Sequence, residues 1–346
     1  MKVAVLSGIK KISIENRPKP LIGPGEALVK IACCGICGSD VHSYLHAIFF
    51  PIGTVMGHEA SGVVSEVGER VNNVKIGDRV AIIPCAPCRF CDACMRGQDN
   101  LCYGRNERDL GQRPGRDGAF AEYIRIPWPE EILCHLPDEI SFEEGAFIEP
   151  LATSFHGVRQ SRLKPGDKVV VAGAGPIGLG VLQWARLGGA QKVIVLEISS
   201  ERSRVAQDLG ADVILNPAKE GAKLFSRIAE LTGGMGADIY YECAGAPESL
   251  QNSIHCVRKG GQVMVIGATE KNAPIQSFQL VLYEVDVQGS FAYTKAEFQM
   301  VIDLLAQKKI NTASMLSTII SLEDIEEKGF KTLVSSPSAV KILVRP

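Results

Sequence analysis

A glycine-rich run in the middle of the chain does most to limit the folds that this sequence can adopt. Gly173-Ala174-Gly175-Pro176-Ile177-Gly178 follows an apolar strand-like segment, 169–172, and opens a segment with helical period. This context is typical of dinucleotide-binding folds, whereas the six residues alone would be a weak signal. Gly173 permits the tight turn, Gly175 lets the backbone approach a pyrophosphate, and Gly178 lets helix and sheet pack closely. Pro176 suits a first helical turn, so the run predicts a phosphate site at a helix N-terminus.

Strand-like and helix-like segments alternate from just before this run onward. After Lys164, runs such as DKVVVAGAG and KVIVLEIS alternate with helix-period segments, ending with a helix over 247–261 and a strand over 262–267. Such alternation is typical of a doubly wound parallel sheet. The first section, and the tail after Val285, are instead rich in short strands broken by turns. We therefore expect an α/β domain inserted between two halves of a mostly β domain.

An acidic residue follows the second strand of the predicted parallel sheet. Glu197 comes 19 residues after Gly178, where a carboxylate can accept hydrogen bonds from ribose hydroxyls and repel a 2′-phosphate. The sequence therefore predicts NAD rather than NADP. Arg202 is included among the cofactor-binding candidates. Arg202 and Arg204 could moderate the exclusion of NADP, although surface charges on a helix are their more ordinary explanation.

Four cysteines lie close together with the spacing of a metal site. They are Cys88, Cys91, Cys94 and Cys102, in the pattern C-x2-C-x2-C-x7-C. Four thiolates can surround one zinc ion tetrahedrally. A disulfide knot is the competing interpretation, but the chain shows no signal-peptide pattern, and disulfides are rare in cytosolic proteins. We expect structural zinc; Cys85 makes a further C-x2-C with Cys88, so one of the five thiols is surplus.

The composition excludes several classes of partner. The 346 residues include 37 lysines and arginines against 39 aspartates and glutamates, so there is no electrostatic case for nucleic acid or an anionic membrane. The apolar runs are far shorter than the about 18 residues of a membrane span. With 46% hydrophobic residues, we expect a cytoplasmic protein of two domains that binds a small molecule.

A second set of metal-ligand residue types lies in the first section, and with it the chain resembles a known family. The set comprises Cys37, His42, His58 and Glu59, within CGICGSDVH and GHEASGVVSEVG. With GDRV, the four-cysteine loop, IEPL, GAGPIG and EVDVQGS, these segments resemble the zinc-dependent medium-chain dehydrogenase/reductase family, polyol dehydrogenase branch. The resemblance covers essentially the whole chain. It implies a GroES-like catalytic domain, 1–155 and 290–346, split around a Rossmann domain, 156–289, with the active site in the cleft between them.

The resemblance also implies a catalytic zinc site. Cys37 and His58 correspond to zinc ligands, and Glu149 stands where the alcohol dehydrogenase branch has a second cysteine. Glu59 is the other carboxylate that approaches the metal in the polyol branch, and which of the two glutamates ligates directly stays open. A carboxylate in place of a thiolate makes zinc a harder Lewis acid. The family spacing also selects the four cysteines named above as structural ligands and leaves Cys85 free.

The family's proton relay maps onto two further residues. Ser39 corresponds to the group that takes the proton of the substrate hydroxyl, and His42 to the group that passes it to solvent. An imidazole with a pKa near 6.5 suits that task. Without the resemblance, a turn serine and an exposed loop histidine would explain them. The segment ending at Gly267 corresponds to backbone that lies against the nicotinamide.

Two departures from the family bear on the substrate. Sorbitol-type enzymes have an arginine where this chain has Ala292, which weakens the case for sorbitol. Four arginines after the cysteine loop could pair with phosphate or carboxylate, although a solvated basic loop explains them as well; they are Arg105, Arg108, Arg113 and Arg116. We expect an NAD-dependent and zinc-dependent secondary alcohol or polyol dehydrogenase. The alternatives are a threonine or sugar-phosphate dehydrogenase, resembling galactitol-phosphate dehydrogenase, and a catalytically silent NAD-binding protein.

Family analogy also implies a homotetramer or homodimer. The segment 285–290 is a plausible strand for sheet pairing between subunits.

Overall fold

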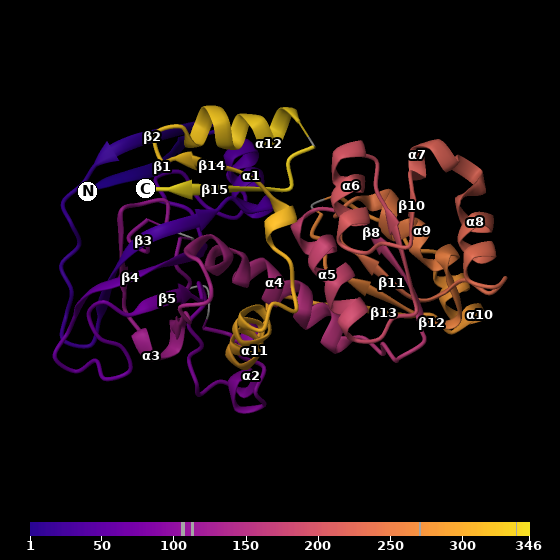
Figure 1. Cartoon of the computed structure of the whole chain (residues 1–346), viewed down its shortest axis with the longest axis horizontal. Coiled ribbons are helices and arrows are strands. Elements are labelled where there is room, and N and C mark those ends of the chain that lie inside the picture. Colours follow the sequence, from indigo (N-terminus) through magenta and orange to yellow (C-terminus); the bar gives the residue numbers. More distant parts are fainter. Residues whose placement is uncertain (105–107, 112–113, 270, 337) are drawn as a thin grey trace. The chain divides into compact units, whose positions relative to one another are not determined.

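The computed structural model describes residues 1–104, 108–111, 114–269, 271–336 and 338–346 (Figure 1). The chain forms two compact units. One contains residues 1–149 and 293–346, and the other contains residues 150–292. The domain boundaries expected from the family, near 155 and 290, stay predictions. Among the described residues, no helix has both the length and the apolar character needed to span a membrane.

The second unit is built on a parallel sheet of six strands. Its order is β10-β9-β8-β11-β12-β13, and every neighbouring pair is parallel. The strands are β8 (Lys168–Ala172), β9 (Lys192–Leu196), β10 (Val213–Leu215), β11 (Ala237–Glu242), β12 (Val257–Val265) and β13 (Asp286–Gly289). The strand order reverses between β8 and β11, and in open sheets of this kind ligands bind beyond the carboxyl ends at that point. The predicted doubly wound sheet is confirmed.

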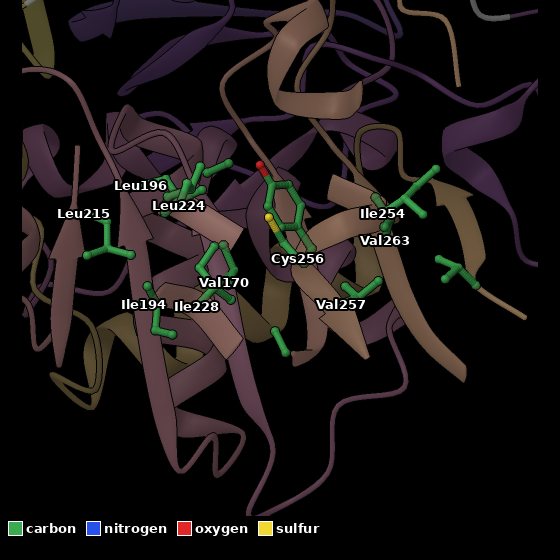
Figure 2. Packing of buried hydrophobic residues seen from close by; sticks show 14 residues of the cluster. Val170, Ile194, Leu196, Leu215, Leu224, Ile228, Ile254, Cys256, Val257 and Val263 are labelled. Atoms are coloured by element: carbon green, nitrogen blue, oxygen red, sulfur yellow. The ribbon is translucent and has the colours of Figure 1, made fainter. Parts of the chain in front are cut away.

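Helices between these strands pack on the sheet and close its core. They are α5 (Pro176–Leu187), α6 (Ser200–Asp208), α7 (Pro217–Glu220), α8 (Leu224–Leu231), α9 (Pro247–Cys256) and α10 (Ser277–Tyr283). Figure 2 shows how Val170, Ile194 and Val263 from three strands lie near Ile228 of α8 and Ile254 of α9. All five side chains are buried, and burial of apolar surface is the main stabilising contribution to such a core.

One element boundary differs from the sequence-based expectation. The helix expected over 247–261 ends at Cys256, and β12 begins at Val257 rather than at Gln262. Val257 pairs with Ala237 of β11, and the register then shifts. Gly260 has a φ of 68°, which an α-helix excludes. Strand pairing and this glycine therefore outweigh the helical period of the segment.

The first unit is mostly β, as expected. Its seven-stranded sheet runs β14-β15-β3-β4-β5-β7, with β6 beside β3. These strands are β3 (Ala27–Gly35), β4 (Glu59–Val67), β5 (Arg79–Ile82), β6 (Tyr123–Ile126), β7 (Leu133–His135), β14 (Leu316–Ser321) and β15 (Lys341–Arg345); β1 (Lys2–Gly8) and β2 (Lys11–Asn16) form a separate hairpin. The last strand of the chain, β15, pairs with β3, so the two halves of this unit share one sheet.

The helices of the first unit are few. They are α1 (Gly38–His46), α2 (Asp92–Met95), α3 (Pro129–Ile132), α11 (Lys295–Ala306) and α12 (Lys331–Ser335). Helix α4 (Phe142–Gln160) begins in this unit and ends in the other. In this unit, short 3₁₀ turns lie at Asp99–Leu101 and Ala313–Met315, and a π-helical turn lies at Ile325–Phe330. A further 3₁₀ turn, at Gly221–Lys223, belongs to the second unit.

Candidate active site and metal centres

Three donor groups from two separate segments of the first unit converge beside the end of β3. A sulfur of Cys37, a ring nitrogen of His58 and a carboxylate oxygen of Glu59 all lie within 4.8 Å of one another. Cys37 is the N-cap of α1, immediately beyond β3, and Glu59 is the first residue of β4. Antiparallel pairing sets Glu59 directly opposite Gly35. The sheet therefore brings together ligands that are 21 residues apart in the chain.

Asp40 contacts the backbone of one of these donors and faces the ring of another, and no sequence motif had assigned it a role. Its Oδ2 accepts a hydrogen bond of 2.9 Å from the backbone N–H of Cys37. Its Oδ1 faces Nδ1 of His58, which leaves Nε2 as the free ligand atom of the ring. Burial would lower the pKa of His58, but the charges of Asp40 and Cys37 outweigh it and hold that pKa well above its usual value.

Glu149 lies beside this group but outside the 4.8 Å cluster. Burial raises its pKa to about 7, against the lowering effect of His58. The buried hydroxyl of Tyr293 adjoins the same carboxylate, and burial together with the charge of Glu149 holds the pKa of that phenol well above its usual value. Like Asp40, Tyr293 was not predicted to be functional, although it directly follows Ala292, the position compared with the sorbitol-type enzymes.

Lys341 is a third residue that the sequence did not single out. It is buried at the first position of β15 and contacts Glu59. Burial would lower its pKa, but Glu59 and Cys37 outweigh that effect and keep the pKa of Lys341 above its usual value. The ammonium is therefore positively charged.

These residues fit a catalytic zinc ion. Thiolate, imidazole and carboxylate are the donors that zinc takes in catalytic sites. Within the described part of the chain, Nδ1 of His58 and Oδ1 of Asp40 are buried without a hydrogen-bond partner, which is costly in a metal-free site. A cation bound at Nε2 of His58 would keep the remaining ring proton on Nδ1, which faces Oδ1 of Asp40, and would favour a hydrogen bond between these two unpartnered atoms.

The relay candidates lie on one face of α1, next to the ligands. Ser39 is half-buried and His42, one turn further on, is exposed. Residues three apart on a helix are neighbours on its surface. The ring of His42 meets Phe49 edge to face, with 6.2 Å between centroids. Ser39 is thus the less exposed and His42 the more exposed member of this pair.

The structural zinc candidates form a second group. Sulfurs of Cys88, Cys91, Cys94 and Cys102 lie within 4.8 Å of one another, and Cys85 is not among them. The backbone N–H of Cys88 donates to the sulfur of Cys102 over 3.2 Å. Backbone amides of Cys94 and Tyr103 lower the pKa of Cys91 to about 6. Four sulfurs grouped this closely, with amides directed at some of them, suit a tetrahedral metal site.

The glycine run has the expected strand–turn–helix context. Gly173 follows β8 with a φ of 90°, and α5 begins at Pro176 with Gly175 as its N-cap. A Cβ on Gly178 would lie 1.8 Å from the carbonyl oxygen of Gly173. At Gly175 a Cβ would meet only the guanidinium of Arg202, at 3.9 Å. The turn is thus closed by Gly178 and open at Gly175, the side from which a phosphate would approach.

Glu197 stands at the end of β9 and braces this turn. Its Oε2 accepts a hydrogen bond from N–H of Ala174, and its Oε1 accepts from Ile198 and Ser199. A hollow of about 490 Å³ beside it is lined by Ser200, Arg204, Asn216 and Lys219 among others.

The remaining cofactor candidates lie on both sides of the glycine turn. Arg202 is half-buried, and burial lowers its pKa. Ile177 is the second residue of α5, and Gly267 follows β12 with its N–H bonded to the carbonyl of Glu242.

The arginine cluster is only partly described. Arg105 and Arg113 lie outside the described residues. The guanidinium carbons of Arg108 and Arg116 lie 4.0 and 5.0 Å from the ring centroid of Trp128, and Arg108 also donates to the carbonyl of Ala86. These two arginines share one aromatic ring as a common contact.

Known proteins are similar to this chain over its whole length. Residues 23–138 match the alcohol dehydrogenase GroES-like domain, and residues 176–307 match the zinc-binding dehydrogenase family. The chain is 38% identical to (R,R)-butanediol dehydrogenase of Bacillus subtilis, covering 100% of both chains, and 36% identical to D-xylulose reductase A of Aspergillus niger, covering 96% of this chain and 95% of that one.

Solved structures agree with these sequence matches. The crystal structure of 2R,3R-butanediol dehydrogenase from Bacillus subtilis superposes with a TM-score of 0.90 at 38% identity, over 100% of this chain and 99% of that one. Galactitol-1-phosphate dehydrogenase from Escherichia coli superposes with a TM-score of 0.91 at 27% identity, over 100% of both chains.

Proposed function

The chain belongs to the zinc-dependent medium-chain dehydrogenase family, polyol dehydrogenase branch, and from this premise we propose that it oxidises a neutral vicinal diol or polyol at a secondary hydroxyl. It is an NAD-dependent alcohol or polyol oxidoreductase, and the expected fold class and enzyme class are confirmed. The observation that carries the proposal is the convergence of Cys37, His58 and Glu59 within 4.8 Å, with Glu149 adjoining. A silent NAD-binding protein would need no such open ligand set.

Cys37, His58 and Glu149 would hold the catalytic zinc, with Glu59 next to the ligand set. When bound, zinc supplies a Lewis acid that lowers the pKa of an alcohol hydroxyl, and NAD supplies the hydride acceptor. Asp40, which faces Nδ1 of His58, would fix the tautomer and orientation of that ring when it binds zinc, a role that carboxylates commonly have behind metal-binding histidines. Cys88, Cys91, Cys94 and Cys102 would hold a structural zinc whose closed shell has no position for a substrate.

Ser39 and His42 would carry the proton away. Ser39 would accept the proton of the substrate hydroxyl, and the exposed His42 would release a proton to water. The order agrees with their burial, because Ser39 is half-buried and His42 is exposed.

The cofactor would bind at the glycine turn of the second unit. Gly173, Gly175, Pro176, Ile177 and Gly178 would frame the pyrophosphate site, and Glu197 with Arg202 would face the adenosine ribose. Gly267 lies beyond the carboxyl end of β12, where the nicotinamide would meet backbone. The negative charge of Glu197 supports NAD over NADP.

The charges around the catalytic ligands favour a neutral substrate. Asp40, Glu59 and Glu149 are acidic, and Lys341 is already paired with Glu59. An anionic group beside these carboxylates would meet repulsion wherever zinc and Lys341 do not neutralise their charge. Arg108 and Arg116 both contact the ring of Trp128. This supports the interpretation that they belong to a basic surface loop rather than to a site that binds a substrate phosphate.

A substrate panel with metal removal tests the proposal. We expect NADH formation with 2,3-butanediol and neutral polyols, abolished by a chelator and restored by Zn²⁺. Threonine and sugar phosphates are expected to react more slowly. Turnover that survives chelation, or no turnover with any alcohol at two zinc ions per chain, would contradict it. Arg116→Ala distinguishes the alternative, because a phosphate reader would raise KM for phosphorylated polyols alone.

A second copy of the chain is the proposed partner at β13. This strand is the edge of the parallel sheet, and unpaired edges template strand addition. Three apolar side chains of the preceding helix α10 are exposed, namely Phe278 (75%), Val281 (79%) and Leu282 (56%). An exposed apolar patch beside an open edge is typical of a subunit interface.

A further inference from the structure

A lysine from the last strand of the chain reaches the carboxylate of Glu59. Nζ of Lys341 lies 2.7 Å from Oε1 and 2.5 Å from Oε2 of Glu59, and 3.0 Å from the carbonyl oxygen of Ile36. An ammonium has three N–H donors, so these contacts use the whole group. The two side chains are 2% and 1% exposed, and water therefore competes little for the pair.

The backbone confines Glu59 to this position. β3 sets Gly35 opposite Glu59, and a Cβ at residue 35 would come 2.1 Å from Oε2. The side chain thus lies flat across a glycine and ends on Lys341. The same carboxylate is nevertheless within 4.8 Å of the donor atoms of Cys37 and His58. Glu59 is therefore near enough to join the ligand set, but is held by a cation instead.

The contact between Lys341 and Glu59 changes the net charge of the proposed metal site. Cys37 as thiolate, Glu59 and Glu149 would bring three negative charges to a dication, one more than it neutralises. Excess negative charge near a metal weakens its attraction for a developing anion on the substrate oxygen. The ammonium of Lys341 supplies the missing positive charge at Glu59, the carboxylate that it contacts.

We infer that Lys341 is a positioning residue that holds Glu59 beside the metal as a neutralised carboxylate, so that Cys37, His58 and Glu149 form the ligand set. Lys341 acts through Glu59 and the charge of the site rather than on the substrate. The inference rests on the proposed function, because it requires zinc at this ligand set.

The test compares four proteins: wild type, Lys341→Met, Glu59→Gln and the double variant. Zinc affinity is measured by competition with a chromogenic chelator, and the ligand set by the visible spectrum of the Co²⁺-substituted proteins. Lys341→Met is expected to tighten zinc binding by roughly 10-fold or more, the size of effect that outer-shell groups have on metal sites. It is expected to weaken the cobalt bands, as Glu59 adds a ligand. Turnover is expected to fall and KM to stay unchanged.

The double variant separates charge from packing. Because it removes one charge of each sign, its turnover is expected to return to at least that of Glu59→Gln. In the Glu59→Gln background, Lys341→Met is also expected to tighten zinc binding, since it removes an unpaired cation. This comparison stays informative where the single Lys341→Met protein does not fold. Lys341→Arg is expected to restore the wild-type cobalt spectrum.

Opposite results overturn the inference. A purely structural lysine predicts looser zinc binding in both backgrounds, and no recovery in the double variant. Lys192→Met is the matched control, because it removes a lysine that donates to a backbone carbonyl, that of Leu231, and should leave all zinc and cobalt readouts unchanged. Wild type that holds one zinc per chain would overturn the proposed site itself; two zinc ions with no effect of Lys341→Met would overturn the role of Lys341 alone.

Discussion

Oδ1 of Asp40 lies 3.7 Å from Nδ1 of His58, and the same carboxylate accepts the backbone N–H of Cys37. One buried acid thus faces the ring of one proposed ligand and accepts a hydrogen bond from the backbone of the other. Asp40→Asn keeps the size of the side chain but removes the charge. We expect zinc affinity at the catalytic site to fall by about 10- to 100-fold, measured by chelator competition. Asp78→Asn, which alters the more exposed pair with His135, should leave it unchanged; equal losses in both variants would contradict the role of Asp40.

The cysteine loop predicts that four of its thiols bind zinc and that the fifth, Cys85, does not. Cys91→Ser is expected to reduce the zinc content from two to one per chain and to lower the free energy of unfolding by a few kcal/mol, as the loss of a metal does. Cys85→Ser should keep both zinc ions, because its sulfur is outside the group. The measurements are atomic absorption and denaturant unfolding. Loss of zinc from Cys85→Ser would show that the ligand set has been misassigned.

Local patterns predicted the fold and the nucleotide turn well. The strand, the glycine turn and α5 lie within twenty residues, from Lys168 to Leu187, and each is determined by nearby residues. The helix end at Cys256 was missed because pairing of Val257 with Ala237 depends on a strand twenty residues away. The helical period of the segment alone carries no information about that contact.

The proposed ligand set could be named only through the family resemblance, and the residues that contact it could not be named from the sequence. Asp40 sits three residues after Cys37 and has the sequence appearance of a first-turn acid of α1. Lys341 begins an ordinary strand at the other end of the chain, and its contact with Glu59 arises from the pairing of β15 with β3. Patterns within short segments of the sequence contain no information about a contact between residues that are 282 positions apart.

The cofactor preference depends on the charge of Glu197. Glu197→Gln keeps an oxygen that can accept the N–H groups of the glycine turn, but removes the charge that repels a 2′-phosphate. We expect kcat/KM for NADP relative to NAD to rise by about tenfold, equivalent to roughly 1.4 kcal/mol. Initial rates with both cofactors measure the ratio. Glu201→Gln, on the exposed first turn of α6, serves as control; a ratio that moves equally in both variants would rule out a specific role for Glu197.

Glu242 predicts a pH dependence of stability in the second unit. Its side chain is buried at the end of β11, and burial raises the pKa of its carboxyl although the amides of Ala244 and Gly245 donate to it. Because the folded pKa is the higher one, this group's contribution to stability is complete below the ordinary value of about 4.3 and is lost as the pH rises through the folded value.

The variant Glu242→Gln should remove this dependence. We expect it to match wild type in the free energy of unfolding at acidic pH and to become the more stable protein toward pH 8, in denaturant titrations at fixed zinc concentration. Glu248→Gln, at an exposed position on α9, should track wild type throughout. A difference between Glu242→Gln and wild type that does not change with pH would contradict the buried-charge explanation.

The exposed face of α10 predicts the oligomeric state. Val281 is 79% exposed, so Val281→Asp should change the stability of a single subunit by no more than about 0.5 kcal/mol. At a subunit interface the same change buries an unpaired charge, which is costly. We therefore expect light scattering to report a smaller assembly for Val281→Asp than for wild type. Val334→Asp, which places the same charge on exposed α12, should leave the mass unchanged. Equal masses for all three proteins would show that subunits do not meet at α10 and β13.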